Sequence, residues 1–271
     1  MTEEFDLTPA EAARQLRQRL ESLRSAGIEY LPVANEPLPV PNVPPASEEQ
    51  AHRVTLFGEE DPTPDEPAAL SPEQRLVALQ LLAKEVSGCT RCKELASTRT
   101  QTVFGVGPPD AELCFIGEAP GRDEDLQGEP FVGPAGQLLN RIIAAAGLKR
   151  QDVYICNVLR CRPPGNRPPK VEEAESCREY LEKTLELLRP RYICTLGASA
   201  AKHLLQLNPA TTMGKLRKRF HDYKGIPVLC TYHPSYLLRL EEPEKTEKKR
   251  EVWEDMKLLL NRMGKPIPAK G

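Results

Sequence analysis

The sequence has few aromatic residues, few histidines and no long apolar run. Only 5% of its 271 residues are aromatic and only four are histidine. No apolar run approaches the roughly 18 residues that a membrane-spanning helix needs, so we expect no membrane span. The N-terminal stretch is acidic and lacks the basic-then-apolar order of a secretory leader, which predicts a cytoplasmic protein.

Proline, by contrast, is abundant, with 27 residues, nine of them between positions 32 and 69. The segment 31–70 is also rich in acidic residues, and such a composition predicts a disordered linker rather than a packed core. Ahead of it, residues 1–30 contain one expected helix, because Thr8 suits its N-cap and an apolar stripe runs from 13 to 23. We expect this helix to be a weakly held tail, or alternatively to bind a protein partner.

Charge is distributed unevenly along the chain. Residues 1–70 carry 14 acidic and 5 basic side chains, a net charge of −9, and the remainder therefore carries +7 of the total of −2. Short basic runs occur at Arg160–Arg162, Lys215–Arg219 and Lys245–Arg250. These runs are either solvated faces or contacts to a phosphate backbone, and a modestly basic body is compatible with both.

The body of the chain, expected over 71–263 with a short tail at 264–271, alternates strand and helix patterns. Ser71-Pro-Glu-Gln is a capping signature for a helix that reaches about Val86. Apolar runs predict strands at 112–116, 153–158, 192–196 and 228–232, separated by helical patterns at 135–146, 171–188, 198–205 and about 246–263. This alternation predicts a three-layer α/β/α fold with a mostly parallel central sheet.

Three polar motifs directly follow expected strands, at Gly117–Gly121, Asn157–Cys161 and His233–Leu237. In parallel α/β sheets, ligands bind beyond the carboxyl ends of the strands. We therefore expect these three motifs to form one site.

The cysteines fall into two groups. Cys89 and Cys92 form a C-x2-C pair, and Cys161 and Cys177 form a C-x15-C pair. In a reducing compartment such clustered cysteines favour a four-thiolate metal site, which could hold zinc or an iron–sulfur cluster. The other four lie within apolar runs and are expected to be buried small side chains, namely Cys114, Cys156, Cys194 and Cys230.

The motif Gly117-Glu-Ala-Pro-Gly121 offers backbone N–H groups and a fixed proline φ. It is either a tight strand-to-loop turn or a cradle for a small ring. Phe131 lies in the Gly- and Pro-rich segment 128–136, where an aromatic side chain has little reason from helix or strand propensity to occur. It is either a core residue or a stacking platform for a base.

Asn157 interrupts an apolar strand, and a buried amide there must find hydrogen-bond partners. A carboxamide offers one donor and one acceptor side by side, which matches the O4 and N3–H edge of uracil, whereas cytosine presents the opposite pattern. His233 follows another strand and is either a structural histidine or a donor to an oxygen that gains negative charge.

Over about residues 72–262 these segments, in one consistent order, resemble the family 4 uracil-DNA glycosylases. The matching segments are Gly117–Asp125, Pro130–Gly133, Asn157–Pro164 and His233–Leu238. The resemblance implies an α/β/α repair enzyme that flips uracil out of DNA and hydrolyses its glycosidic bond, leaving an abasic site. It also implies a [4Fe–4S] cluster on the four clustered cysteines, and so favours iron–sulfur over zinc.

The resemblance further implies roles for individual residues. Gly117, Glu118 and Ala119 would line the uracil pocket. Phe131 would stack on the flipped base, and Asn157 would read its edge.

The resemblance implies catalytic roles as well. His233 would face uracil O2 and stabilise the departing anion. Glu124 is the expected general base beside the attacking water, with Glu118 as the second candidate. Leu237 or Leu238 would fill the gap that the flipped base leaves in the duplex.

Two departures from the wider superfamily refine this expectation. Enzymes with a Gly-Gln-Asp-Pro-Tyr-His motif have an aspartate where this chain has Ala119 and a tyrosine where it has Gly121. A second branch bonds covalently to DNA through a histidine, and the corresponding segment 163–170 has none. We therefore expect turnover rather than covalent trapping on DNA. Because no lysine is placed by motif near the site, we expect no lyase step. We also expect a monomer that acts on single- or double-stranded DNA containing uracil.

Two other functions stay open at this point. One is a glycosylase of the same fold that removes a different base, such as hypoxanthine. The other is a non-catalytic, metal-bound nucleic-acid-binding module, which would have no reason to place Phe131, Asn157 and His233 together.

Overall fold

The computed structural model describes residues 70–268, and the fold is built on a five-stranded sheet in the order β2-β1-β3-β5-β4. The strands are β1 (Leu113–Gly117), β2 (Tyr154–Asn157), β3 (Tyr192–Leu196), β4 (Phe220–Tyr223) and β5 (Ile226–Thr231). The first three pairings in this order are parallel and β4 pairs antiparallel with β5, so the expected mostly parallel sheet is confirmed. Expectations for residues 1–69, the tail helix and most of the linker, lie outside the described residues.

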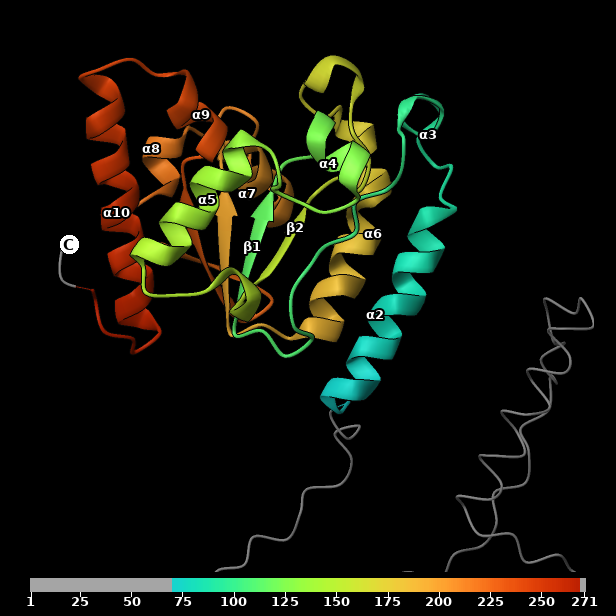
Figure 1. The fold of residues 1–271 in the computed structure, drawn as a ribbon, viewed down its shortest axis with the longest axis horizontal. Coiled ribbons are helices and arrows are strands. Elements are labelled where there is room, and N and C mark those ends of the chain that lie inside the picture. Colours follow the sequence, from blue (N-terminus) through green and yellow to red (C-terminus); the bar gives the residue numbers. More distant parts are fainter. Residues whose placement is uncertain (1–69, 269–271) are drawn as a thin grey trace, which may run out of the picture. The chain divides into compact units, whose positions relative to one another are not determined.

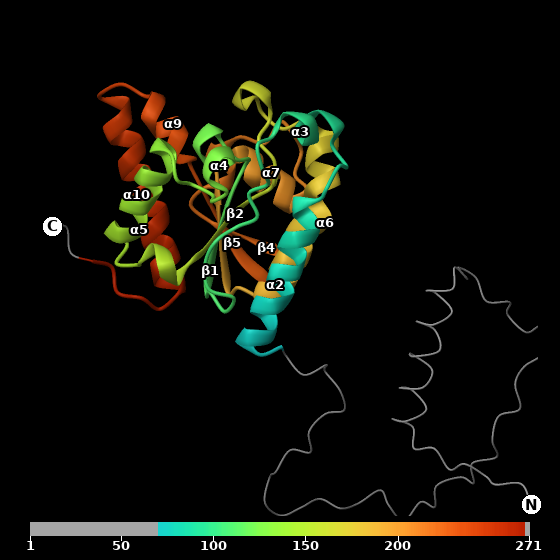
Figure 2. The ribbon, with the colours of Figure 1, turned by 45° about the vertical axis from the view of Figure 1, so that its right-hand side comes forward.

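Helices cover both faces of the sheet (Figures 1 and 2). The helices are α2 (Pro72–Ser87), α3 (Lys93–Thr98), α4 (Arg122–Gln127), α5 (Pro134–Ala145), α6 (Val171–Leu188), α7 (Ala198–Leu205), α8 (Met213–Leu216), α9 (Pro234–Arg239) and α10 (Glu244–Arg262). Side chains of α2, α6 and α7 share one apolar cluster with the sheet, and those of α5, α9 and α10 share the other. This is the predicted three-layer arrangement.

The first described helix starts where its capping residues predict. The Ser71 N–H donates to Gln74 Oε1 at 2.9 Å, and the Gln74 N–H donates to Ser71 Oγ at 3.3 Å. This reciprocal pair satisfies two of the N–H groups that a helix start leaves free. Helix α2 then packs its buried face, which includes Leu79 and Leu82, on the layer that contains α6.

The structure adds elements that hydrophobic periodicity did not indicate. Strand β4 is short and partly exposed, and α4 is a six-residue, mostly charged helix, so neither has an apolar pattern in the sequence. Val106 also bridges to Ile155 and covers the outer edge of β2. The antiparallel β4 occupies the opposite edge, so it completes the sheet without changing its parallel centre.

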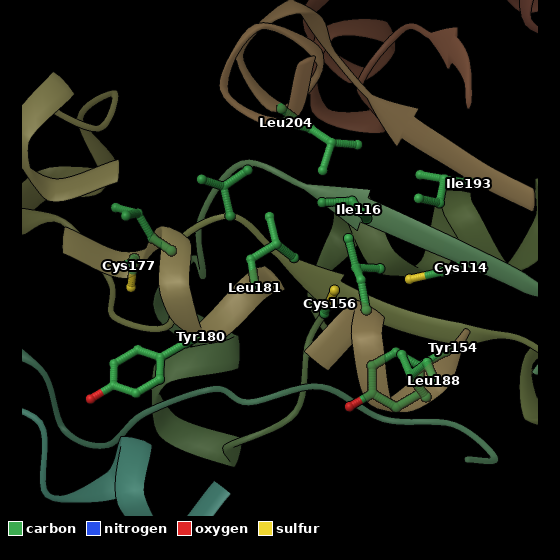
Figure 3. Packing of buried hydrophobic residues seen from close by; sticks show 14 of the residues in the cluster. Cys114, Ile116, Tyr154, Cys156, Cys177, Tyr180, Leu181, Leu188, Ile193 and Leu204 are labelled. Carbon is green, nitrogen blue, oxygen red and sulfur yellow. The ribbon is translucent and has the colours of Figure 1, made fainter. Parts of the chain in front are cut away.

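The core is dense with small sulfur-containing side chains. Cys114, Cys156, Cys194 and Cys230 are fully buried, which confirms that part of the cysteine prediction. Figure 3 shows Cys114 and Cys156 on neighbouring strands, with Cys177 and Tyr180 farther along the same apolar cluster. Within residues 70–268, no helix is both long and apolar enough to cross a membrane.

Candidate functional site

A cleft of about 560 Å³ lies beyond the carboxyl ends of the parallel strands. In Figure 1 the carboxyl ends of β1 and β2 point toward the side of the sheet where α4 lies, and α4 contributes Arg122 and Glu124 to the lining of the cleft. All three predicted motifs contribute to its wall, through Glu118 to Gly121, through Asn157 and through His233. A cavity of this size accommodates a single small ring with its substituents.

Gly117, Asn157 and Phe131 meet at the floor of the cleft. Gly117 and Asn157 are paired in register at the ends of β1 and β2. A Cβ atom on Gly117 would lie 2.6 Å from Phe131 Cζ and closer still to Asn157 Oδ1, so only glycine fits there. Asn157 Oδ1 is buried without a hydrogen-bond partner among the described residues. A buried acceptor that the protein leaves unpaired is available to a ligand.

Phe131 is held in an unusual backbone conformation. Its φ is +55°, in the left-handed region that bulky side chains rarely adopt. Gly136, at the start of α5, has no Cβ and so lets that helix lie directly against the Phe131 backbone. The Phe131 ring packs in the apolar cluster of α5 while also lining the cleft, with its centroid 5.6 Å from that of His233. The two roles considered for this ring are therefore compatible.

His233 immediately precedes α9 and caps it. Its Nδ1 accepts the Ser235 N–H at 3.1 Å and lies 2.7 Å from Ser235 Oγ. Because Nδ1 is an acceptor, the ring proton of the neutral form resides on Nε2. Burial, with a smaller effect from the charge of Arg239, lowers the pKa of His233 to about 4. At neutral pH the imidazole is therefore an uncharged N–H donor on the wall of the cleft.

The Glu124 carboxylate ties two loops together through backbone hydrogen bonds. Its Oε2 accepts the Gly121 N–H, and its Oε1 accepts the N–H groups of Val132 and Gly133, each at 3.0 Å. Charge-assisted bonds of this kind are strong, so they hold the 117–121 turn against the Phe131 loop. This geometry favours a positioning role for Glu124, and its role as general base stays a prediction.

Glu118, the second candidate for the base, lies between the main cleft and an adjoining cavity of about 340 Å³. Burial raises the pKa of Glu118, opposed by a hydrogen bond with Ser199 and by the charge of Arg239. A carboxylate in such an environment is a better proton acceptor than an exposed one. Geometry and environment thus favour Glu118 over Glu124 for proton transfer.

The two wedge candidates differ sharply in exposure. Leu237 is 1% exposed and packs in the apolar cluster with α5 and α10. Leu238 is 38% exposed on the next position of α9. Insertion of Leu237 into DNA would remove it from the core, so the structure corrects this alternative and leaves Leu238.

A buried polar network supports the chain just before His233. The Thr231 hydroxyl donates to Asp255 Oδ2 at 2.7 Å, and Arg217 Nε donates to the same oxygen at 2.6 Å. The Tyr232 hydroxyl donates to Glu251 Oε2 at 3.0 Å, and the Arg217 guanidinium lies 4.5 Å from the centre of the Tyr232 ring. These contacts anchor the end of β5 to α10.

The four clustered cysteines come together on the other side of the same β2 segment. Cys89 and Cys92 pack against the apolar cluster that contains Cys161 and Cys177. Burial, with smaller effects from the Cys161 and Cys92 thiols, raises the pKa of Cys177 to about 11, although a backbone hydrogen bond and the charge of Arg160 oppose the shift. Burial also raises the pKa of Cys161 and Cys92. The two pairs therefore lie close enough for their thiols to affect one another's pKa, and their role as metal ligands stays a prediction.

The arrangement of these thiols bears on the kind of metal group they could hold. Within the described part of the chain, no group of three or more Cys, His, Asp or Glu side chains is close enough to share a single metal ion. In a four-iron cluster each cysteine binds a different iron, so the thiols lie farther apart than around one zinc. Four cysteine thiols are a donor set that either a zinc ion or a four-iron cluster uses.

Some cleft residues were not singled out by sequence reasoning. Arg122, Arg167 and Arg239 line the cleft, and Ser235 orients His233. Arg239 directly follows the His233–Leu238 motif, so proximity to that motif was the available signal. Nothing in the local pattern distinguished Arg122 and Arg167 from other surface arginines.

The fold and the cleft define an α/β/α protein with a polar cleft beyond the carboxyl ends of its parallel strands. The family described as the uracil DNA glycosylase superfamily matches residues 104–257. A type-4 uracil-DNA glycosylase of Archaeoglobus fulgidus is 46% identical over 167 residues, covering 59% of this chain and 83% of that protein.

Two further relatives agree with this match. A type-4 uracil-DNA glycosylase of Thermotoga maritima is 40% identical over 66% of this chain and 91% of its own length. One of Saccharolobus solfataricus is 44% identical over 59% of this chain and 77% of its own length. The chain belongs to the uracil DNA glycosylase superfamily and, within it, to the type-4 uracil-DNA glycosylases.

Proposed function

We propose that the protein excises uracil from DNA by hydrolysis of the glycosidic bond and leaves an abasic site. The observation that carries this proposal is the unpaired, buried Asn157 Oδ1 at the floor of a cleft that Phe131 and His233 also line. Membership of the superfamily supports the reaction class. The geometry supports the choice of base.

Recognition of uracil rests on Asn157 and Phe131. The unpaired Oδ1 would accept the uracil N3–H, and the amide nitrogen would donate to O4, while the Phe131 ring stacks on the face of the base. Cytosine would place an acceptor opposite Oδ1 and a donor opposite the amide. Buried polar groups left unpaired in this way discriminate by roughly 10⁴-fold or more.

Bond cleavage places negative charge on the departing base, and His233 is arranged to stabilise it. Its Nε2–H would donate to uracil O2 as the C1′–N1 bond breaks and the electron pair moves onto the base. Because the imidazole is already neutral, it donates a hydrogen bond without carrying a charge that burial would penalise. The sugar develops oxocarbenium character in the same step.

Water then adds to C1′, and a carboxylate accepts its proton. We assign this role to Glu118, because both oxygens of Glu124 are occupied by backbone N–H groups. Glu124 instead positions the two loops that shape the cleft. The assignment reverses the order of the two candidates that sequence motifs implied.

DNA would reach the cleft through its cationic rim. Arg122 and Arg239 line the cleft and can contact phosphates, which makes binding salt-dependent, whereas Arg167 is already paired with Glu173 and Glu94. Leu238 is exposed on α9 and would fill the space that the flipped nucleotide leaves.

We further propose that Cys89, Cys92, Cys161 and Cys177 hold a [4Fe–4S] cluster, which the family resemblance implies and the thiol arrangement fits. When bound, the cluster would supply folding energy by joining α3, the segment after β2 and α6. The chain's own residues carry out binding and hydrolysis in the scheme above. A monomeric, cytoplasmic enzyme remains our prediction.

The test is a glycosylase assay on single- and double-stranded oligonucleotides with one uracil, followed by alkaline cleavage at abasic sites. We expect strand breaks that depend on uracil with the wild type, and a loss of about 10²- to 10³-fold with Asn157→Ala. Asn157→Asp should also lose activity, because a carboxylate cannot donate to O4.

Oligonucleotides that contain inosine, thymine or only normal bases serve as controls. Cleavage of inosine DNA with little cleavage of uracil DNA would replace this proposal with a different base specificity. Absence of cleavage by iron-loaded wild type would point to a binding module. Full activity of Asn157→Asp would refute the role given to Asn157.

A further inference from the structure

Arg160 is a buried cation for which the described residues offer no anionic partner. Its side chain is 1% exposed, and it lies between β2 and the cysteine ligand candidate Cys161 in the chain. One guanidinium nitrogen donates to the Phe104 carbonyl and another to Thr184 Oγ1, at 2.5 and 3.0 Å. Both acceptors are uncharged, and Nε has no partner within residues 70–268.

Such an arrangement is costly unless a negative charge lies nearby. A buried ion without a counter-charge costs several kcal/mol even after the protein relaxes around it. Hydrogen bonds to neutral oxygens satisfy the donors but do not compensate the charge. Another buried arginine of this protein shows the usual solution, because Arg217 pairs with Asp255 and Glu251. Arg160 forms no ion pair with a carboxylate anywhere in the described part.

The groups around Arg160 that can become anionic are cysteines and the Tyr154 hydroxyl. The Arg160 N–H and its side-chain charge both act on Cys177, and Cys161 is the next residue. On the sheet side, a hydrogen bond from Cys114, the charge of Arg160 and a hydrogen bond from the Arg160 side chain lower the pKa of Cys156 to about 7 against the effect of burial. Figure 3 shows Cys156 beside Cys114 in the interior of the apolar cluster, where a lone thiolate would lack water.

We infer that Arg160 is the buried counter-ion of the cluster held by Cys161 and Cys177, and that its charge raises the cluster's reduction potential and retains the cluster. This inference rests on the cofactor assignment of the proposed function. Four thiolates give such a cluster net negative charge, and reduction makes that charge more negative. A nearby fixed cation stabilises the reduced form more than the oxidised form, which raises the potential.

Arg99 repeats the arrangement on the outer side of the cysteine site. Its Nη1 donates to Cys161 Sγ at 3.1 Å, and its Nη2 donates to the Ser87 carbonyl at 3.2 Å. Arg99 is partly exposed, so solvent screens its charge more than that of Arg160. We therefore expect the same direction of effect from Arg99 with a smaller size.

The experiment compares cluster-loaded wild type with Arg160→Met, Arg160→Lys and Thr184→Val. Arg160→Met removes the charge and keeps much of the side-chain volume, and Arg160→Lys keeps the charge. Thr184→Val changes no charge and removes only the hydroxyl that accepts from Arg160 and donates to the Tyr180 carbonyl. The readouts are iron and sulfide content, the midpoint potential from a titration followed by electron paramagnetic resonance, and the rate of bleaching in a chelator.

We expect Arg160→Met to have a lower midpoint potential and to lose its cluster about tenfold faster. Arg160→Lys should restore most of both properties, and Thr184→Val should change neither. Unchanged potential and bleaching in Arg160→Met, or equal changes in Thr184→Val, would overturn the inference, because the effect would then not follow the charge.

Two further outcomes are also decisive. If Arg160→Met yields protein without iron while Arg160→Lys loads normally, iron loading itself requires the positive charge, which supports the inference. If neither variant loads iron, the shape of the arginine side chain is required rather than its charge, which contradicts the inference. Cys156→Ala should leave the potential unchanged, and a rise would identify the Cys156 thiolate as the counter-charge instead. These readouts need no glycosylase activity, so failure of the proposed reaction would be recognised separately.

Discussion

The cleft and the cysteine site lie at opposite ends of one five-residue segment, Asn157–Cys161, yet they are prepared for their ligands in different ways. The cleft contains an unpaired neutral acceptor on Asn157 and an uncharged donor on His233. The cysteine site contains buried thiols whose pKa values burial raises, beside a cation without a carboxylate partner, Arg160.

This difference matches two kinds of ligand. The uncharged groups of Asn157 and His233 suit a neutral ring that enters and leaves, because contacts with that ring then require no countercharge. Buried thiols that resist ionisation, next to a buried cation, suit a group that supplies metal charge and remains in place. The predictions below test whether the two regions are separable in this way.

The largest expected effect is on the cysteine site. Cys177→Ser should abolish iron binding and lower the free energy of unfolding by an amount on the order of 10 kcal/mol, as loss of a structural metal site does. Metal analysis and thermal unfolding measure this. Cys194→Ala, which changes a buried cysteine elsewhere in the sheet, is the matched control and should keep its iron. Normal iron content in Cys177→Ser would remove Cys177 from the ligand set.

The next effect separates the two carboxylates of the cleft. Glu118→Gln should lower kcat by about 10²- to 10⁴-fold with little change in thermal stability. Glu124→Gln should lower the free energy of unfolding by about 1–3 kcal/mol. The glutamine amide has only one acceptor oxygen, so either its NH₂ group faces the Gly121 N–H, donor against donor, or other backbone N–H groups lose their acceptor.

The pH dependence sharpens this comparison. Since burial raises the pKa of Glu118, kcat of the wild type should fall as pH drops through a value above 4.5. A large loss of kcat in Glu124→Gln with unchanged melting would restore Glu124 as the base. Steady-state kinetics and melting of both variants decide between the two.

His233 should make stability depend on pH. The unfolded chain binds a proton on this residue near pH 6.5, but the folded protein does so only near pH 4. The stabilisation is complete above pH 6.5 and is lost as pH falls toward 4, by about 3 kcal/mol. The difference in unfolding free energy between wild type and His233→Gln, measured in urea at several pH values, should follow this course. Parallel pH profiles of the two proteins would contradict the lowered pKa.

The smallest effect concerns the exposed leucine of α9. Leu238→Ala should slow uracil excision from duplex DNA by roughly tenfold or less and leave single-stranded DNA unaffected, because only a duplex has a gap to fill. Leu237→Ala should instead lower stability with no strand dependence, since Leu237 is in the core. Equal losses on both substrates for Leu238→Ala would argue against a wedge.

Sequence reasoning reached the parallel sheet, most helices and the grouping of the three motifs. The expected strand at 192–196 and the helices at 171–188 and 198–205 occur at those bounds. Long periodic segments carry enough signal to be located. Strand β4 and helix α4 carry little, because β4 is short and partly exposed and α4 is mostly charged.

The site shows the same division. Asn157, Phe131 and His233 were recognisable because each is an unusual residue type for its local pattern. The sequence could not distinguish Glu118 from Glu124, or Leu237 from Leu238, because each pair consists of two residues of the same type in one motif. Hydrogen bonding and burial distinguish them, and both depend on neighbours from distant segments.

The amino-acid sequence by itself determined the alternation of strands and helices, the carboxyl-end placement of the motifs and the two pairs of cysteines, because these follow from local periodicity and spacing. Only the tertiary structure decided which polar groups are left without partners. It buries Asn157 Oδ1 without a partner among the described residues, occupies both oxygens of Glu124 and buries Arg160 beside the cysteines. Hydrogen-bond partners and burial depend on residues from distant segments that meet only in the folded chain. They determine the free energy of binding that a ligand gains from these polar groups.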